Sequence, residues 1–291
     1  MRIAIAIATT GRPNIVDQTA PRWAGQTRPY DRLVFSLASE GDLGATARAL
    51  PDAEVLIGPK GSCTQRNRIL DHLNGECDLV VFADDDYVPS RRFLELTESI
   101  FSANPSLAIL SGWVVEDGIN TQGIAFDEAI KIVEEWDSKP EKTNASIIDI
   151  THAYGCNMIV RPGAKPDLRF DERLPLYGWL EDLDYSRRMA PYGEIKRAHN
   201  IIGVHMGVKG GRTSGVRLGY SQVANPMYFV KKGTMPAGEA LKNIARNLVA
   251  NAVKTLRPEP WVDRGGRLRG NLLALADALR GRQHPERVND L

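Results

Sequence analysis

The sequence predicts an α/β protein in which a mostly parallel sheet is flanked by helices. In the first half of the chain, short apolar runs alternate with segments whose apolar residues recur at helical spacing, as in βαβ units. With 291 residues, 43% hydrophobic and 25% charged, the chain is long enough to bury a large core. We expect strands at residues 2–8, 32–37, 54–57, 78–83 and 107–111, and helices at residues 63–73 and 91–104.

The second half of the chain is less regular. Short strands are expected at residues 147–150, 157–160 and 201–204, and a helix that starts near a glycine is expected over residues 176–189. Apolar residues recur at the spacing of an amphipathic helix between residues 239 and 256. Residues 257–269 are rich in Pro, Gly and Arg, and a last short helix is expected at residues 272–279. The sequence therefore predicts a helical C-terminal extension.

This extension is basic. Residues 239–291 carry ten Lys or Arg and six Asp or Glu, so they are net +4 in a chain of net +1. The preferred interpretation is a helix that packs on the rest of the chain or forms a dimer contact, because no Trp- or Phe-rich face accompanies the charge. Peripheral attachment to an anionic membrane is the alternative.

Composition excludes several classes of protein. A net charge of +1 argues against a general nucleic-acid-binding surface. The three cysteines are Cys63, Cys77 and Cys156, and their wide spacing fits a reducing cytoplasm better than a disulfide framework or a zinc site. No window approaches 18 uninterrupted apolar residues, so no spanning helix is expected. We expect a cytoplasmic protein, with a peripheral position at the inner face of the membrane as the alternative.

Three consecutive carboxylates, Asp84, Asp85 and Asp86, directly follow an apolar strand and precede Pro89. Adjacent negative charges repel one another, and hard oxygen ligands suit Mg²⁺ or Mn²⁺, which bind carboxylates together with phosphate oxygens. A solvated acidic turn is the alternative, but the buried strand before it and the proline after it favour a metal site. The turn at residues 9–13 also ends a strand, so both turns are expected to face one site.

A second acidic pair, Glu181 and Asp182, lies in the first turn of an expected helix. Acids there have a routine explanation, because they complement the helix dipole by ~0.3–1 kcal/mol. Tyr177 and Trp179 precede the pair and resemble a surface for stacking a sugar more than a helix cap. Packing of this aromatic pair in the core is the alternative.

Together these motifs resemble family 2 inverting glycosyltransferases of the GT-A fold, over residues 1–235. Four segments match in order and spacing: the first loop at residues 7–13, the pair Arg66 and Asn67, the D-x-D metal motif at residues 84–89, and Glu181 and Asp182 followed by Arg187 and Arg188. Two smaller similarities are residues 225–232, which resemble the closing segment of the domain, and His205, which matches a position that often ligates the metal. A hydrogen-bonding role for His205 stays open.

The resemblance implies a catalytic domain at residues 1–235 and a helical, basic extension at residues 236–291. It implies transfer of a sugar from a nucleotide-diphosphate donor, UDP-sugar most of all, to a hydroxyl of a saccharide or lipid-linked saccharide acceptor. The transfer would be inverting and would serve bacterial surface polysaccharide or glycoconjugate synthesis.

The expected site residues follow from these motifs. Asp86 is expected to ligate Mn²⁺ or Mg²⁺, Asp84 to contact the ribose or the metal, and Asp85 to contact the donor or only shape the turn. Asp182 is the expected catalytic base, with Glu181 as its rival. Other expected roles are Thr9, Arg12, Arg66 and Arg212 around the nucleotide, His205 at the metal, and Tyr177 and Trp179 against a sugar.

Two departures from the family pattern lie in the nucleotide pocket. Gly11 stands where Asn is usual, and the second strand has no acid until Glu40. The base of the donor therefore stays open, with GDP and dTDP as alternatives to UDP.

The residues after the first strand argue against two other classes of enzyme. A sugar nucleotidyltransferase would carry a glycine-rich, lysine-containing loop after the first strand, but residues 8–13 hold one glycine and no lysine. An oxidoreductase would need G-x-G-x-x-G at that place. A non-catalytic nucleotide-sugar-binding protein would not need both acidic motifs.

Overall fold

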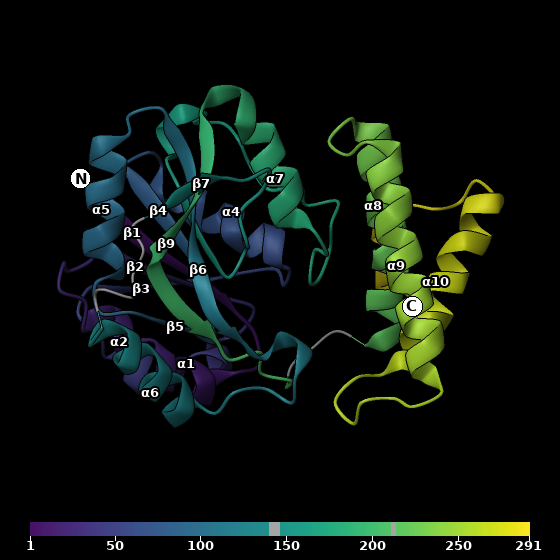
Figure 1. The fold of residues 1–291 in the computed structure, drawn as a ribbon, viewed down its shortest axis with the longest axis horizontal. Helices are drawn as coiled ribbons and strands as arrows, with labels where there is room; N and C mark the ends of the chain where they lie inside the picture. Colours follow the sequence, from purple (N-terminus) through teal and green to yellow (C-terminus); the bar gives the residue numbers. More distant parts are fainter. Residues whose placement is uncertain (140–145, 211–213) are drawn as a thin grey trace. The chain divides into compact units, whose positions relative to one another are not determined.

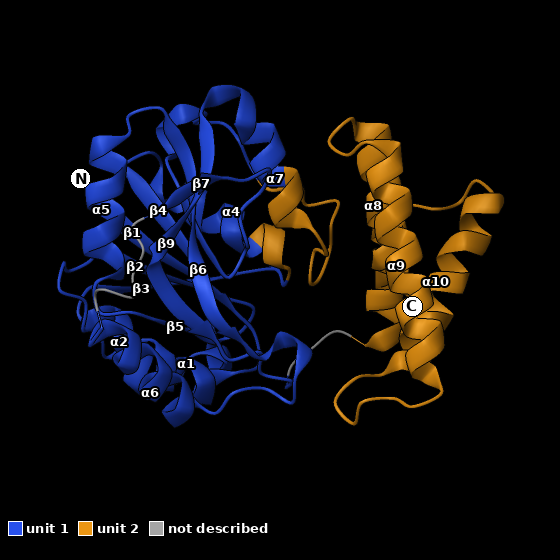
Figure 2. Cartoon of the chain, viewed as in Figure 1, with its two compact units in different colours: residues 1–60, 65–169, 185–211 blue, residues 61–64, 170–184, 212–291 orange. Residues whose placement is uncertain are grey.

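The structure is a computed structural model that describes residues 1–139, 146–210 and 214–291. The chain forms two compact units, drawn in different colours in Figure 2. Unit 1 comprises residues 1–60, 65–169 and 185–211, and unit 2 comprises residues 61–64, 170–184 and 212–291. The boundary expected at residue 235 separates a catalytic domain from an extension, and it stays a prediction.

Unit 1 is built on one sheet, which has nine strands in the described part of the chain (Figure 1). The strands are β1 (Ile3–Thr9), β2 (Arg32–Leu37), β3 (Ala53–Ile57), β4 (Leu79–Asp84), β5 (Tyr87–Pro89), β6 (Leu107–Asp117), β7 (Ile147–Asp149), β8 (Asn157–Val160) and β9 (Glu194–His205). Their order is β3-β2-β1-β4-β8-β6-β9-β5, and β7 pairs with β9. Strands β5, β7 and β8 run against the other six. The predicted α/β fold with a mostly parallel sheet is confirmed.

The helices of this part of the chain flank the sheet. They are α1 (Pro13–Thr19), α2 (Pro21–Ala24), α3 (Ala45–Arg48), α4 (Ser62–Leu73), α5 (Phe93–Ala103), α6 (Phe126–Asp137) and α7 (Glu181–Met189). Helix α6 was not expected; it packs on β5 and β9, where Ala129 and Val133 join Val88 and Val204 in a buried cluster. Short 3₁₀ helices of unit 1 are η1 (Glu40–Asp42), η2 (Gly118–Asn120), η4 (Pro162–Ala164) and η5 (Ala190–Tyr192), and unit 2 contains η6 (Pro285–Asp290).

The core of unit 1 anchors the strand that follows the acidic residues. Strand β1 is buried along almost its whole length, as expected of a strand covered on both faces. Tyr87, the first residue of β5, is fully buried, and its ring lies 6.0 Å from Phe93 and 6.4 Å from Trp23. Asn157 Nδ2 donates to the Tyr87 hydroxyl at 3.2 Å. These contacts fix the C-terminal side of the turn at residues 85–86.

The long helices of unit 2 are α8 (Gly215–Lys232), α9 (Ala237–Thr255) and α10 (Arg264–Leu279). The sequence predicted α9 correctly but placed the start of the last helix at residue 272, whereas Asp263 caps α10 by accepting from Gly266 N at 2.7 Å. Helices α8 and α10 touch through backbone, because a Cβ at Gly219 would lie 2.0 Å from Arg267 O. No described helix is long and apolar enough to cross a membrane.

A buried amide network holds the three helices together. Asn251 of α9 donates to Gln222 of α8 at 2.9 Å and to Asn271 of α10 at 2.8 Å. Asn271 in turn donates to Gly219 O at 2.7 Å. Because buried amides must find partners, this network favours one register of the three helices over its neighbours.

Candidate functional site

The acidic turn lies at the carboxyl ends of two neighbouring parallel strands. β1 and β4 pair in register up to Ala8 and Asp84, so Thr9 and Asp85 follow at the same edge of the sheet. Thr9 Oγ1 donates to Asp85 Oδ2 at 2.7 Å. Asp84 is partly exposed, whereas Asp85 and Asp86 are buried. The two turns therefore face one site, as the strand order in an open α/β sheet requires.

Asp84, Asp86 and His205 form a cluster suited to a divalent metal. His205 ends β9 and stands opposite Tyr87 in the pairing of β5 with β9, so strand register brings it to the acidic turn. His205 Nε2 lies 3.3 Å from Asp86 Oδ1 and 4.0 Å from Asp84 Oδ2, and one ligand atom from each residue lies within 4.8 Å of the others. Two carboxylates and an imidazole are a donor set that accepts Mn²⁺ or Mg²⁺.

Asp117 orients the imidazole of His205. Asp117 ends β6 and pairs with His205 in the register of β6 and β9. Its Oδ1 lies 2.9 Å from His205 Nδ1, and its Oδ2 accepts from Tyr154 Oη at 3.1 Å. Carboxylates that bind the second nitrogen of a ligating histidine commonly fix its tautomer and direction. The sequence reasoning missed Asp117, although residues 113–115 continue the apolar run that predicted a strand at residues 107–111.

The carboxylates determine the charge of His205. Burial lowers its pKa, but hydrogen bonds and charge from Asp117 and Asp86 outweigh burial and raise the pKa to about 10. Burial has the opposite effect on Asp86 and raises its pKa. The hydrogen bond and the charge from His205 outweigh burial, so the pKa of Asp86 falls to about 2. At neutral pH and without metal, His205 is therefore an imidazolium beside two carboxylates. A metal that binds Nε2 must displace a proton.

Asp85 bonds within the protein through both carboxylate oxygens. Besides Thr9 on Oδ2, Arg12 Nη1 donates to Oδ1 at 2.8 Å, and Thr19 donates to the backbone carbonyl at 2.7 Å. Burial raises the pKa of Asp85, Arg12 opposes this and Asp86 adds to it, giving about 6. This bonding supports the alternative in which Asp85 shapes the turn.

Two arginines lie beside the acidic turn. Arg12 also donates from Nε to Gly210 O at 2.9 Å. Arg66 is buried, and its Nη2 donates to Asp84 Oδ1 and to Gly155 O, both at 3.1 Å. These guanidinium groups offset part of the charge of the three carboxylates and suit phosphate oxygens. Arg212, the third predicted arginine, lies outside the described residues.

Asp42 organises the first loop, which sequence reasoning did not anticipate. The sequence has no acid at the end of the second strand before Glu40. The structure shows that Asp42 is buried and accepts from Gly11 N at 2.8 Å, Ala38 N at 3.0 Å and Ser39 N at 2.8 Å. Its carboxylate therefore joins the loop after β1 to the loop after β2.

The predicted catalytic pair lies in the first turn of α7, and residues 181–184 belong to unit 2. The helix begins at Glu181, not at residue 176, because Leu176, Gly178 and Leu180 have φ angles of 59°, 67° and 68°. A leucine is uncommon in this left-handed region and costs of order 1–3 kcal/mol there, and such strained residues cluster near functional sites. Asp182 Oδ1 accepts from Leu183 N at 2.8 Å.

A buried ion pair holds this end of α7. Asp184 is fully buried and accepts from Lys232 Nζ and Thr234 Oγ1, each at 2.8 Å. Both partners lie at the C-terminal end of α8. The sequence did not reveal that Lys232 pairs with Asp184, because a pair 48 residues apart has no local signature.

The predicted sugar-stacking residues precede α7. Tyr177 is 51% exposed, Trp179 is half-buried, and their ring centroids lie 6.3 Å apart. Seven of the predicted site residues lie together in unit 1: Thr9, Arg12, Arg66, Asp84, Asp85, Asp86 and His205. Glu181, Asp182, Tyr177 and Trp179 belong to unit 2, and their roles stay predictions.

The fold matches that of solved glycosyltransferases. A mannosyltransferase, PcManGT from Pyrobaculum calidifontis in complex with GDP-Man and Mn²⁺, is similar with a TM-score of 0.58 and 15% identity, over 97% of this chain and 88% of that one. S. aureus TarS 1–349 in complex with UDP is similar with a TM-score of 0.52 and 13% identity, over 100% and 87%. The same TarS fragment with UDP-GlcNAc gives 0.52 and 14%, over 100% and 84%. The sequence itself matches no protein-family model and no curated protein.

Proposed function

We propose that the protein is a metal-dependent glycosyltransferase that moves a sugar from a nucleoside diphosphate donor to a hydroxyl acceptor. The observation that carries the proposal is the cluster of Asp84, Asp86 and His205 at the carboxyl edge of the sheet. Its support is the fold, which is shared with structures that hold GDP-Man, UDP and UDP-GlcNAc. This is the edge at which ligands bind in open α/β sheets.

The donor side of the reaction belongs to unit 1. Asp84, Asp86 and His205 would hold Mn²⁺ or Mg²⁺, which offsets the negative charge of a diphosphate leaving group. Arg12 and Arg66, next to these carboxylates, would contact donor oxygens. A UDP-sugar is the favoured donor.

The acceptor side would use the start of α7. Asp182, with Glu181 as its rival, would accept the proton of the attacking hydroxyl as the nucleoside diphosphate leaves. A single in-line displacement inverts the anomeric configuration, as in family 2 enzymes of the GT-A fold. Tyr177 and Trp179 would pack against sugar faces.

The acceptor and the biological role are also part of the proposal. The acceptor would be a saccharide or lipid-linked saccharide, and the reaction would serve bacterial surface polysaccharide or glycoconjugate synthesis in the cytoplasm. Residues 1–235 would form the catalytic part of the chain.

The test is product release from a panel of UDP-, GDP- and dTDP-sugars with a mixed acceptor extract, with and without Mn²⁺. Metal-dependent release of a nucleoside diphosphate, lost in Asp86→Asn, is the expected result. Release of pyrophosphate from a sugar phosphate and a nucleoside triphosphate would indicate nucleotidyl transfer instead. Donor binding without any product would indicate a nucleotide-sugar-binding protein.

A further inference from the structure

Unit 2 exposes an unusual amount of apolar surface. In the described part of the chain, twelve large apolar side chains are exposed, and seven of them lie between residues 241 and 279. These are Leu241, Val249, Val253, Leu256, Leu272, Leu273 and Leu279. Single exposed leucines are ordinary, but a concentration of this kind marks an interaction surface.

Helix α9 has two apolar faces, and only one of them is covered. Ala240 is buried, and Ile244 packs against the core of unit 2. On the opposite side, Val249 and Val253 lie four residues apart and are 60% and 62% exposed, and Leu241 is exposed on the flank between the two faces. A surface helix of a globular protein needs one apolar face, so the second face calls for a partner.

The exposed face of α9 is positively charged. Helix α9 carries Lys242, Arg246 and Lys254 and one acid, Glu239 in its first turn, and Arg257 follows shortly after its end. In the described part of the chain, Lys254 pairs with Glu259 at 2.5 Å. A shallow hollow on this face is lined by Lys242, Ala245, Arg246, Val249, Ala250, Val253 and Lys254. Apolar and basic side chains therefore alternate on one surface.

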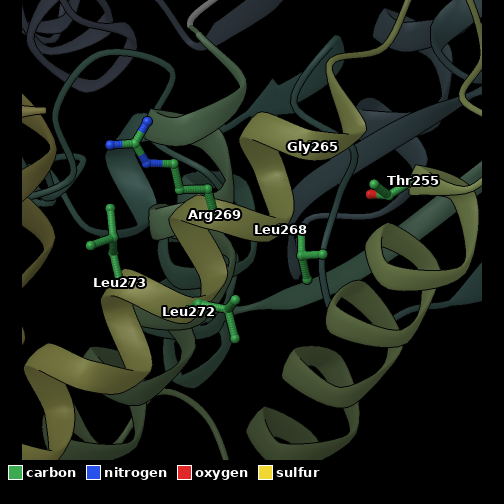
Figure 3. A pocket seen from close by; sticks show the side chains of 6 residues that line it. All are labelled: Thr255, Gly265, Leu268, Arg269, Leu272 and Leu273. Atoms are coloured by element: carbon green, nitrogen blue, oxygen red, sulfur yellow. The ribbon is translucent and has the colours of Figure 1, made fainter.

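Helix α10 contributes to a hollow on another side of α9. Thr255 at the end of α9 and five residues of α10 line a second hollow, shown in Figure 3. Leu268 and Leu272 lie along one line of α10, and Arg269 and Leu273 lie along the neighbouring line. We call the residues that line the hollow on α9 alone the α9 face.

We propose that the α9 face docks on an anionic membrane surface. Leucine and valine side chains would enter the boundary between headgroups and acyl chains, while Lys242 and Arg246 contact lipid phosphates. From sequence, the lack of a Trp- or Phe-rich apolar face favoured packing of this tail on the rest of the chain. The exposure of Leu241, Val249 and Val253 favours the membrane instead. A second copy of the chain fits less well, because it would bring two basic faces together.

The test is flotation of the full chain with vesicles and needs no enzymatic activity. We expect the protein to float with phosphatidylcholine vesicles that contain 30% phosphatidylglycerol and to stay behind with phosphatidylcholine alone. Each basic residue near such a surface strengthens binding by about 5-fold, so Lys242→Gln with Arg246→Gln should weaken it by about 25-fold. Val249→Ser with Val253→Ser should also weaken binding, at any salt concentration.

A matched control separates the effect of the α9 face from the effect of net charge. Lys60→Gln with Lys131→Gln removes two exposed charges from unit 1 and should leave flotation unchanged. Equal loss in this control, or no flotation of folded wild-type protein with anionic vesicles, would overturn the proposal. So would a dimer in light scattering that the two serine substitutions dissociate, because the face would then be a self-interface. Binding to a soluble polyanion that the serine substitutions leave intact would likewise overturn it.

Discussion

The affinity of the cluster for Mn²⁺ should rise steeply with pH, because His205 must lose a proton to become a ligand. The pKa of His205 is raised to about 10. At pH 7.5 the imidazolium therefore lowers apparent metal affinity ~300-fold, or about 3 kcal/mol, relative to a neutral ring. Between pH 6.5 and 8.5 the apparent Kd should fall by about tenfold per pH unit.

Titration calorimetry with Mn²⁺ measures this directly. Repeating the titration in two buffers of different ionisation enthalpy gives the number of protons released, which should be close to one. The variant Asp117→Asn removes a hydrogen bond that raises the pKa of His205, so its affinity should level off at a lower pH than in the wild type. His205→Gln is the matched control and should bind Mn²⁺ more weakly with little dependence on pH. A wild-type affinity that stays flat from pH 6.5 to 8.5, with no proton released, would refute this reasoning.

Three further outcomes follow from the described contacts. Asp182→Asn should keep the thermal shift given by nucleotide and Mn²⁺ while abolishing product release; retained turnover would move the base to Glu181 or elsewhere. Asn251→Ala should lower the free energy of unfolding by about 1–3 kcal/mol, because it leaves buried amides of the neighbouring helices unpaired; an unchanged denaturation midpoint would contradict this. Lys232→Met should destabilise the protein by roughly 3 kcal/mol, because Asp184 is fully buried; Lys232→Arg, which keeps the charge, should lose less.

The donor side of the site was predictable because its signals are local. An apolar run that ends in three acids identifies both β4 and the turn at residues 84–86, and β1 is equally clear. Asp117 was missed for the opposite reason. Its role depends on pairing with β9, 88 residues away, and on β6 running to residue 117. Such pairings are set by the sheet and leave no pattern in the sequence around either residue.

Helix boundaries failed where backbone conformation departs from residue preference. Leucine normally favours helix, yet Leu176 and Leu180 adopt left-handed conformations that delay α7 to Glu181. Helix α10 starts at Arg264 because the Asp263 cap offsets two glycines in the first turn, and glycines there argued against a helix. At α7 the surrounding structure outweighs residue preference, whereas at α10 a local side-chain cap does.

The pairing of β5 with β9 makes the metal cluster depend on strand register. Side chains alternate between the two faces of a strand, so a shift of one residue would replace His205 by Val204 beside the acidic turn. The ladder between β6 and β9 already absorbs irregularities near Gly112 and Val114, upstream of the histidine. Insertions and deletions should therefore be tolerated in the loops before β9 but not within its last three residues. In a set of related chains, constant spacing from Gly203 to His205 would mark the members that keep the cluster.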